Sequence, residues 1–239
     1  MTAAAFPPSL TPAQLAVGVV QVWVTDLDRW IESSMGMPVS LAPDEVSRAE
    51  RFHNPLHGKR WRTGRQFLRA VLGSHLGSDP SELELGVAEM GKPFLPESVL
   101  SFNLSHSGER VVVAVTSRRD VGIDVEAMVD RGLELDPLAE RFFTPGERAE
   151  LGVREGSERA AAFYRCWTRK EAVMKADGGG LVVPPEAINV GAGTKPDVVV
   201  ADPPWKHLER YRVLDLEIER QYACALAVAD VVEVKVTAV

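Results

Sequence analysis

Asp124 and Glu126 are the two residues of this 239-residue chain whose spacing most directly suggests chemistry. They lie in Val121-Gly122-Ile123-Asp124-Val125-Glu126, where apolar and polar residues alternate as they do in a half-buried strand. Side chains two residues apart on a strand share a face, so we expect both carboxylates to project together. Two adjacent carboxylates repel each other and favour a cation, and hard oxygen ligands suit Mg²⁺ or Mn²⁺. An exposed strand face with two solvated acids explains the spacing equally well.

A third acid lies in Trp167-Thr168-Arg169-Lys170-Glu171-Ala172-Val173-Met174-Lys175, within a long helix that we expect to start near Ser157. Glu171 shares the apolar stripe of Trp167 and Met174, where an acid requires a partner, and Lys175 follows one turn later. An ordinary surface pair four residues apart is the alternative. If this helix packs beside the strand of Asp124 and Glu126, three carboxylates and one ammonium converge. That set suits a divalent cation and a phosphate, with one acid available as a base.

Two further stretches carry groups that bind phosphate oxygens. Gly91-Lys92-Pro93 offers a closely approachable backbone and a cation, and Ser105-His106-Ser107-Gly108 offers hydroxyls and an imidazole on a predicted loop. Neither stretch is specific alone. The other four histidines have the ordinary structural interpretation.

The charge distribution limits the class of ligand. A formal net charge of −7 argues against general nucleic-acid binding. The segment from Arg51 to His75 nevertheless contains six lysines and arginines and no acid. This local basic segment indicates an anionic ligand of limited size, such as a nucleotide, although a solvated helix face is the alternative.

The sequence contains no signal-peptide pattern at its start and no apolar run near the roughly 20 residues that span a bilayer. Its two cysteines, Cys166 and Cys224, have apolar neighbours and no ligand spacing, so we interpret them as reduced core thiols. These features predict a cytosolic protein that does not enter the membrane.

The order of expected elements predicts an α+β fold made of two similar lobes, residues 1–119 and 120–239, related by a pseudo-two-fold axis. In the first half we expect strands at 19–24, 83–85, 100–104 and 110–116, a short helix or loop at 26–37, and helices at 44–52 and 59–76. In the second half Ala139-Glu140-Arg141-Phe142 repeats Ala49-Glu50-Arg51-Phe52, and the long helix precedes a second hairpin with strands at 214–216 and 222–229. We expect the ligand cleft at the lobe interface, and two internal lobes make a monomer sufficient.

The motifs together resemble the 4′-phosphopantetheinyl transferase superfamily, in its long two-lobed form named after the surfactin-synthetase activator (Sfp). The resemblance runs from the first strand to the last hairpin and rests on four motifs in order. These are Gly91-Lys92-Pro93, Phe102-Asn103-Leu104-Ser105-His106-Ser107, Gly122-Ile123-Asp124-Val125-Glu126 and the segment from Trp167 to Lys175.

The resemblance implies a Mg²⁺-dependent transfer of phosphopantetheine from coenzyme A to a serine of an apo acyl or peptidyl carrier protein, releasing adenosine 3′,5′-bisphosphate. It assigns Asp124, Glu126 and Glu171 to the metal, Glu171 to the general base, and Lys175 to phosphate oxygens or the attacking hydroxyl. It assigns Lys92, Ser105 and His106 to the phosphates, and Arg48, Arg62 and Thr63 to the adenosine end.

Two positions depart from the family pattern. Glu45 and Arg48 lie near where the family has early lysines, and Val125 between the two acids supplies no ligand, so waters complete the metal shell. For the carrier surface we expect Arg148, Arg154 and Arg159 with Phe142 and Phe143. Another Mg²⁺-dependent phosphoesterase or nucleotidyl transferase, and a non-catalytic coenzyme A-binding module, are the alternatives.

Overall fold

The computed structural model describes residues 15–33, 41–129, 134–179, 182–196, 199–230 and 233–239. The first half contains β1 (Val19–Asp26), α1 (Leu27–Ser33), α2 (Pro43–Glu50), α3 (Pro55–Leu76), η1 (Pro80–Glu82), β2 (Gly86–Val87), β3 (Pro93–Phe94), β4 (Leu100–Ser107) and β5 (Arg110–Ser117). The second half contains β6 (Val121–Ala127), α4 (Leu135–Phe142), α5 (Pro145–Gly152), α6 (Gly156–Asp177), η4 (Pro185–Ala187), β7 (Ile188–Asn189), β8 (Val200–Ala201), η5 (Trp205–Arg210), β9 (Tyr211–Asp215), β10 (Tyr222–Ala229) and β11 (Glu233–Ala238).

The strand order repeats between the two halves. In the first sheet β1 pairs with β5 and β5 with β4, all antiparallel. In the second sheet β6 pairs with β10 and β10 with β9, again all antiparallel. Each half therefore runs strand, helices, hairpin, and closes the hairpin on its first strand in the same order, which confirms the predicted α+β fold of two similar lobes.

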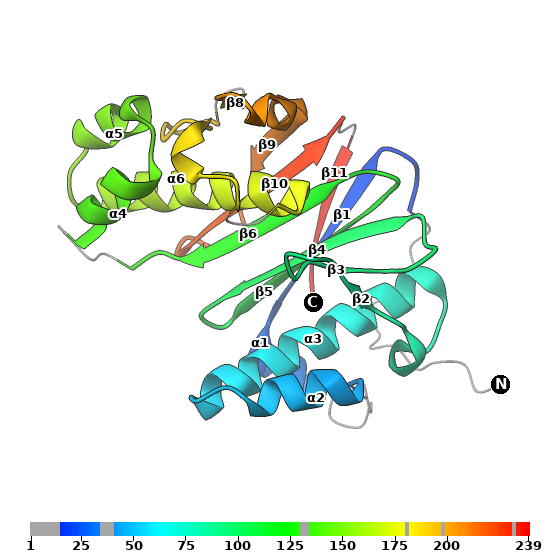
Figure 1. Cartoon of the computed structure of the whole chain (residues 1–239). Coiled ribbons are helices and arrows are strands. Elements are labelled where there is room, and N and C mark those ends of the chain that lie inside the picture. The colour runs from blue at the N-terminus through cyan, green and yellow to red at the C-terminus, as the bar shows by residue number, and fades with distance from the viewer. Residues whose placement is uncertain (1–14, 34–40, 130–133, 180–181, 197–198, 231–232) are drawn as a thin grey trace.

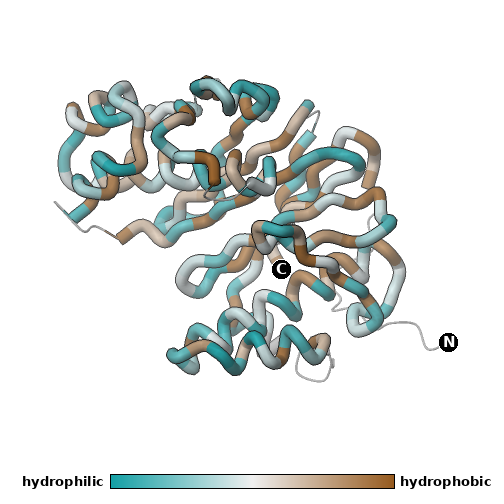
Figure 2. Tube along the Cα trace, viewed as in Figure 1, coloured by the Kyte–Doolittle hydropathy of each residue, from teal (hydrophilic) through white to brown (hydrophobic). Residues whose placement is uncertain are grey.

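The two sheets pack face to face between the two long helices, with α3 on one outside and α6 on the other (Figure 1). The core between the sheets takes alternate residues from both halves: Val20, Val22, Val24, Val112, Ala114, Val121, Ile123, Val125, Cys224, Leu226 and Val228. Side chains of opposite parity on the same strands face the helices. Figure 2 shows the corresponding hydrophobic strands, whereas α2 at the outside is largely hydrophilic. The shared core fixes the lobes against each other.

A buried ion pair also occurs once in each half. Glu45, near the start of α2, accepts from the Arg69 Nε of α3 at 2.7 Å, and Arg69 also donates to two carbonyls around η1. Glu147, near the start of α5, pairs with the Lys170 Nζ of α6 at 2.7 Å, and Lys170 donates to two carbonyls around η4. Both glutamates also accept from the backbone N–H three residues earlier. The same network thus anchors the long helix in both lobes.

These two ion pairs show which helices of the two halves correspond, and they differ from the correspondence that the sequence match suggested. Because the two glutamates are equivalent, α2 corresponds to α5, and both begin with Pro-x-Glu. The tetrapeptide match of 49–52 with 139–142 instead links the end of α2 to α4. It is therefore coincidental, although the two-half architecture that it suggested is present.

Both long helices end at a glycine. α3 ends at Gly77, which has a left-handed φ of 64°, and α6 ends at Gly178 with a φ of 82°, conformations that glycine adopts without strain. α3 begins at Pro55, four residues before the predicted start, because Asn54 caps it by accepting from the Leu56 N–H. α1 covers part of the predicted segment 26–37, whose residues 34–37 lie outside the described residues.

Two local predictions are wrong. No strand forms at 83–85, since the Leu83 carbonyl accepts from the buried Arg69 guanidinium and the chain pairs only at β2. Ser105, His106 and Ser107 lie within β4, not on a loop, so their side chains alternate between its faces.

β11 returns to the first lobe. It pairs in parallel with β1, and Gln21 and Thr25 of β1 donate to Thr237 and to the Val239 carbonyl. Division of the chain at residues 119 and 120 stays a prediction, but the last strand of 120–239 belongs to the first sheet.

Within the described part of the chain, none of the helices combines the length and the apolar character that crossing a bilayer requires.

Candidate active site

The candidate site forms where the edge strand of the first sheet meets the edge strand of the second. β4 and β6 lie side by side at this seam (Figure 1). Three alternate side chains of β4 bind β6. Asn103 accepts from the Ile123 N–H at 2.9 Å, the Ser105 hydroxyl donates to Asp124 Oδ1 at 2.8 Å, and the Ser107 hydroxyl donates to Glu126 Oε2 at 2.7 Å.

Asp124 and Glu126 share the face of β6 that packs on α6. Gly122, two residues earlier on the same face, makes this packing close: a Cβ there would lie 2.1 Å from the Ala172 carbonyl oxygen and 2.3 Å from the Ala176 nitrogen. A glycine is therefore required for the acid-bearing strand to contact the helix. The helix therefore packs beside the strand of Asp124 and Glu126, which is the condition for the three carboxylates and the ammonium to converge.

Lys175 is the cation at the seam. Its ammonium donates to Asp124 Oδ1 at 2.6 Å and to the Ser105 hydroxyl at 3.1 Å, so it joins residues of both lobes. Burial lowers the pKa of Lys175, but the charges of Asp124, Glu171 and Glu126 outweigh burial and raise the pKa above its usual value. Lys175 is therefore charged at neutral pH.

Glu171 lies one turn before Lys175 on α6. Burial raises the pKa of its carboxyl, Lys175 opposes this, and the negative charges of Asp124 and Glu126 raise it further. The three acids therefore lie close enough to influence one another. A raised pKa brings a carboxyl closer to the range of an efficient base at neutral pH.

A cavity of about 240 Å³ opens beside this cluster. It is lined by Trp61 and Arg65 of α3, Leu104, Ser105 and His106 of β4, and Lys175. Arg65 contributes a buried Nη1 that has no hydrogen-bond partner, and the guanidiniums of Arg48 and Arg65 lie 5.5 and 5.2 Å from the Trp61 ring centroid. An aromatic ring with cations around it suits a planar anionic ligand.

His106 stands at the mouth of this cavity. Protein atoms around the imidazole displace water, and this desolvation lowers its pKa; the positive charges of Lys175 and Arg60 lower it further. The imidazole is therefore neutral at pH 7 and can both donate and accept a hydrogen bond.

A second cavity, of about 320 Å³, adjoins the other end of the seam. Ser107 and Glu126 lie on its wall, and its remaining lining is apolar, with Leu138 and Phe142 of α4 and Trp167 of α6 among the contributors. The two cavities thus begin at successive positions of the β4 face that binds β6, Ser105 for the first and Ser107 for the second.

The other predicted residues lie elsewhere. Arg62 is exposed and lines a separate cavity between α2 and α3. Thr63 is buried on α3. The Lys92 ammonium does not line the cavity of Ser105 and Lys175; it donates to three backbone carbonyls. Of the two positions near which the family has early lysines, Glu45 is a buried partner of Arg69, and Arg48 lies beside Trp61.

Sequence reasoning missed three contributors to the site. Trp61 and Arg65 lay within the basic segment without being singled out, and their spacing of four residues was the available signal. Ser107 was visible as part of an alternating series with Asn103 and Ser105, had the strand been extended through it. In the same motif as Glu171, Arg169 and Lys170 are fully buried anchors, with Arg169 held by Asp215 and two carbonyls.

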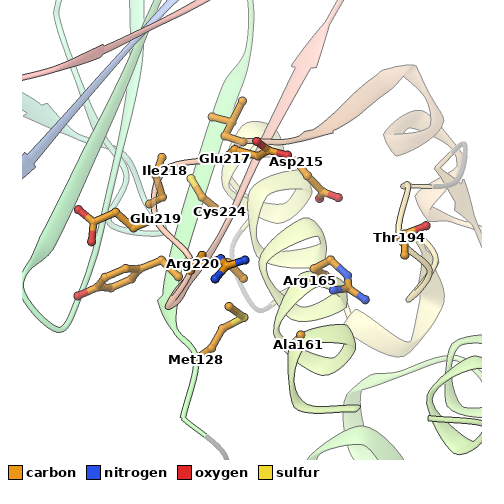
Figure 3. A pocket seen from close by; sticks show the side chains of 13 residues that line it. Met128, Ala161, Arg165, Thr194, Asp215, Glu217, Ile218, Glu219, Arg220 and Cys224 are labelled. Carbon is orange, nitrogen blue, oxygen red and sulfur yellow. The ribbon is translucent and has the colours of Figure 1, made fainter. Parts of the chain in front are cut away.

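A larger cavity, of about 660 Å³, lies between α6 and the β9–β10 hairpin (Figure 3). None of the predicted site residues lines it. Two of its acids are already paired, Asp215 with Arg169 and Glu219 with Arg110. Size alone therefore does not make it the better candidate.

Family models match the chain in two adjoining stretches. Residues 120–227 match the 4′-phosphopantetheinyl transferase superfamily, and residues 30–118 match the N-terminal region of 4′-phosphopantetheinyl transferases. A curated relative, the 4′-phosphopantetheinyl transferase HetI of Nostoc sp., is 36% identical over 85% of this chain and 86% of its own length. The chain belongs to the 4′-phosphopantetheinyl transferase superfamily. It is therefore an enzyme, and the predicted resemblance is confirmed.

Other relatives agree with this assignment. The transferase Sfp of Bacillus subtilis strain 168 is 31% identical over 63% of this chain and 66% of its own length. AcpT of Escherichia coli K12 is 39% identical over 59% and 69%. A solved holo-(acyl-carrier-protein) synthase of Bacillus anthracis, in complex with CoA (3′,5′-ADP), matches 47% of this chain and 96% of its own chain at 24% identity and a TM-score of 0.35. That likeness is too low to add to the assignment.

Proposed function

We propose that this transferase moves the 4′-phosphopantetheine group of coenzyme A to a serine of an apo carrier protein and releases adenosine 3′,5′-bisphosphate. The observation that carries the proposal is the seam itself. Ser105 from the first lobe and Asp124 and Lys175 from the second meet within 3.1 Å, beside a cavity lined by Arg65, whose Nη1 is buried without a hydrogen-bond partner.

The cavity beside Trp61 holds the nucleotide. Trp61 stacks on the adenine, while the unpartnered Nη1 of Arg65 and the neutral His106 donate to phosphate oxygens. Arg48, beside the same ring, adds positive charge at the adenosine end. Arg62 and Thr63 have less support, since one lies at another cavity and the other is buried.

Lys175 and the Ser105 hydroxyl bind the diphosphate. Because Lys175 remains charged, its ammonium stabilises the negative charge that grows on the leaving bisphosphate as the P–O bond breaks. It also keeps Asp124 in place, so binding needs no rearrangement of the β6 face.

Asp124, Glu126 and Glu171 would hold Mg²⁺ or Mn²⁺. Among the described residues no three His, Cys, Asp or Glu side chains already form a metal-binding group. Asp124 Oδ2 nevertheless is buried without a hydrogen-bond partner, and Asp124 and Glu126 both lie close enough to Glu171 to raise its pKa. An oxygen-only set fits such an ion, which would neutralise charge on the diphosphate. Val125 faces the core between the sheets, so waters would complete the shell.

Glu171 is the general base. The serine Oγ attacks the phosphorus that bears the pantetheine, its proton passes to the Glu171 carboxylate directly or through a water, and the bond to the adenosine bisphosphate breaks. The raised pKa of Glu171 supports this role, since a more basic carboxylate takes the proton more readily.

The carrier approaches over the apolar cavity of Leu138, Phe142 and Trp167. Attacking and leaving oxygens lie roughly in line in phosphoryl-type transfers, so the serine comes from the side opposite the nucleotide cavity. The apolar cavity begins at Ser107 and Glu126, on that side. Of the residues expected at the carrier surface, Phe142 lines this cavity, whereas Phe143 is buried, and Arg154 and Arg159 are already paired with Glu158 and Asp136.

One chain supplies both sides of the seam, so a monomer suffices. The two free cysteines, both buried, support a cytosolic setting, and the net charge of −7 argues against nucleic acid as a partner.

Intact-mass spectrometry of an apo carrier protein incubated with coenzyme A, Mg²⁺ and this enzyme tests the proposal. We expect the carrier to gain one phosphopantetheine group on a serine, with one adenosine 3′,5′-bisphosphate released per group. Nucleotide turnover without any carrier gain would instead favour a phosphoesterase or nucleotidyl transferase. Coenzyme A binding without turnover, across several carriers, would favour a binding module.

A further inference from the structure

Lys92 makes a contact between the lobes that its motif did not predict. It lies on the turn between β2 and β3 of the first lobe. Its ammonium donates to the carbonyls of Lys175 at 2.6 Å, Val121 at 3.1 Å and Ala176 at 3.2 Å, all in the second lobe. Three donors and three acceptors are thereby satisfied.

The acceptors explain why a cation is needed there. The last four carbonyls of an α-helix have no partner within the helix, and those of Lys175 and Ala176 belong to the last turn of α6. A cation at this end also complements the helix dipole. Gly178 completes the cap by donating its N–H to the Met174 carbonyl. Lys92 is thus a capping group supplied to α6 by the other lobe.

The electrostatic environment agrees with this assignment. Burial lowers the pKa of Lys92, and the negative charges of Asp120 and Asp177 oppose the decrease. Asp120 precedes Val121 and Asp177 follows Ala176, the residues whose carbonyls accept from Lys92. These neighbours account for a cation at position 92 without a bound phosphate.

We propose that Lys92 is a positioning residue that fixes the last turn of α6, and with it the Lys175 side chain, and that its ammonium does not contact the coenzyme A phosphates. The shortest of its three bonds ends on the carbonyl of Lys175, whose own ammonium joins Ser105 and Asp124. The effect on turnover rests on the proposed function; the effect on the helix does not.

Amide hydrogen exchange tests the contact without any turnover. Lys92→Met keeps the apolar stem and removes the three donors, so exchange of the Gly178 amide and its neighbours at the end of α6 should accelerate at least tenfold. Lys59→Met is the control, because the Lys59 side chain is exposed and its ammonium makes a long, exposed contact of 3.9 Å with the Asp28 carboxylate. Unchanged exchange in Lys92→Met would overturn the proposal.

Kinetics and calorimetry then separate positioning from phosphate binding. We expect Lys92→Met to lower kcat roughly 10- to 100-fold, with the KM for coenzyme A and the Kd for adenosine 3′,5′-bisphosphate within twofold of wild type. Lys92→Arg, which retains donors, should recover part of kcat. A tenfold weaker Kd for the bisphosphate would show that Lys92 contacts phosphate and overturn the proposal.

A double-mutant cycle shows whether Lys92 acts through Lys175. In a Lys175→Met background, Lys92→Met should lower single-turnover rates by less than threefold, because the group that it positions is gone. The same fold loss in both backgrounds would contradict positioning. If wild-type enzyme modifies no carrier, the proposed function fails, while hydrogen exchange and bisphosphate binding still decide the role of Lys92.

Discussion

The protonation of Glu171 depends on its neighbours at the seam. Burial and the negative charges of Asp124 and Glu126 raise the pKa of its carboxyl, and the Lys175 ammonium opposes this. Because Glu171 is both the proposed base and a proposed metal ligand, one proton should affect both roles. The sequence was enough to single out Glu171 as a candidate site residue, because an acid on an apolar helix stripe must have a partner. Its orientation toward β6 could not be predicted without the fold.

At this position we predict that Glu171→Gln lowers kcat at least 10³-fold while coenzyme A still binds, since the amide keeps the shape and loses the base. Stopped assays of carrier modification and calorimetry with coenzyme A measure the two effects. Glu158→Gln, an exposed acid on the same helix, is the matched control. A Glu171→Gln enzyme with near-normal turnover would remove the base assignment.

His106 gives a prediction about pH and stability. Its folded-state pKa lies below the unfolded value near 6.5, so the unfolded chain binds a proton that the folded chain does not. Stability should therefore fall as pH drops through about 6.5, and His106→Gln should remove part of that loss. Urea midpoints at pH 7.5 and 5.5 check this: the midpoint of the variant minus that of wild type should be larger at pH 5.5 than at pH 7.5. A constant difference would show that His106 is not responsible.

At the scale of elements, the contact between β6 and α6 brings the acids and the lysine together. The alternating pattern of β6 and the long stripe of α6 were sufficient to predict both elements. Their close approach was not predictable, because it depends on Gly122 meeting the backbone of a helix about 50 residues later. Ser105 and Ser107 likewise gained their partners only from the pairing of two sheet edges.

We predict that Gly122→Ala lowers the free energy of unfolding by about 1–3 kcal/mol, because the new methyl meets backbone atoms that cannot move independently. Turnover should fall as well, since α6 carries Glu171 and Lys175. Gly152→Ala is the control: a Cβ there meets nothing within 4 Å. Chemical unfolding with both variants measures the difference, and equal stabilities would refute the packing argument.

At the scale of the molecule, the two lobes share one order of elements, yet among the described residues the paired acids lie on the first strand of the second lobe and not on that of the first. Trp23 of β1 corresponds to Asp124 of β6. Each lies three residues after a valine at the start of the strand pairing, Val20 in β1 and Val121 in β6. The offset in residue number between Trp23 and Asp124 equals that between the first residues of α3 and α6. Trp23 packs in the core under α3 and donates to His75. The position that carries a carboxylate in the second lobe is therefore occupied by a core tryptophan in the first.

The repeat was visible in the order of elements, whereas its true alignment was hidden. A chance tetrapeptide drew attention to α4, and the equivalence of α2 and α5 emerged only through the two buried ion pairs. The return of β11 to the first sheet was not predictable either, because a terminal strand pairs with whichever edge is free in three dimensions.

Because the core between the sheets draws on both halves, the lobes should unfold together. Ile123→Ala, at a fully buried position of that core, should cost about 2–5 kcal/mol and shift a single transition without splitting it. Calorimetry together with fluorescence of the tryptophans checks this. Two separate transitions would mean that the shared core does not couple the lobes.

A crystal structure of the enzyme with coenzyme A and Mg²⁺ would decide whether the seam of β4 and β6 is the active site. We expect adenine on Trp61, the diphosphate between Ser105 and Lys175, and the metal ion on Asp124. Nucleotide bound instead in the cavity of Figure 3, with the seam of β4 and β6 unchanged, would contradict this expectation.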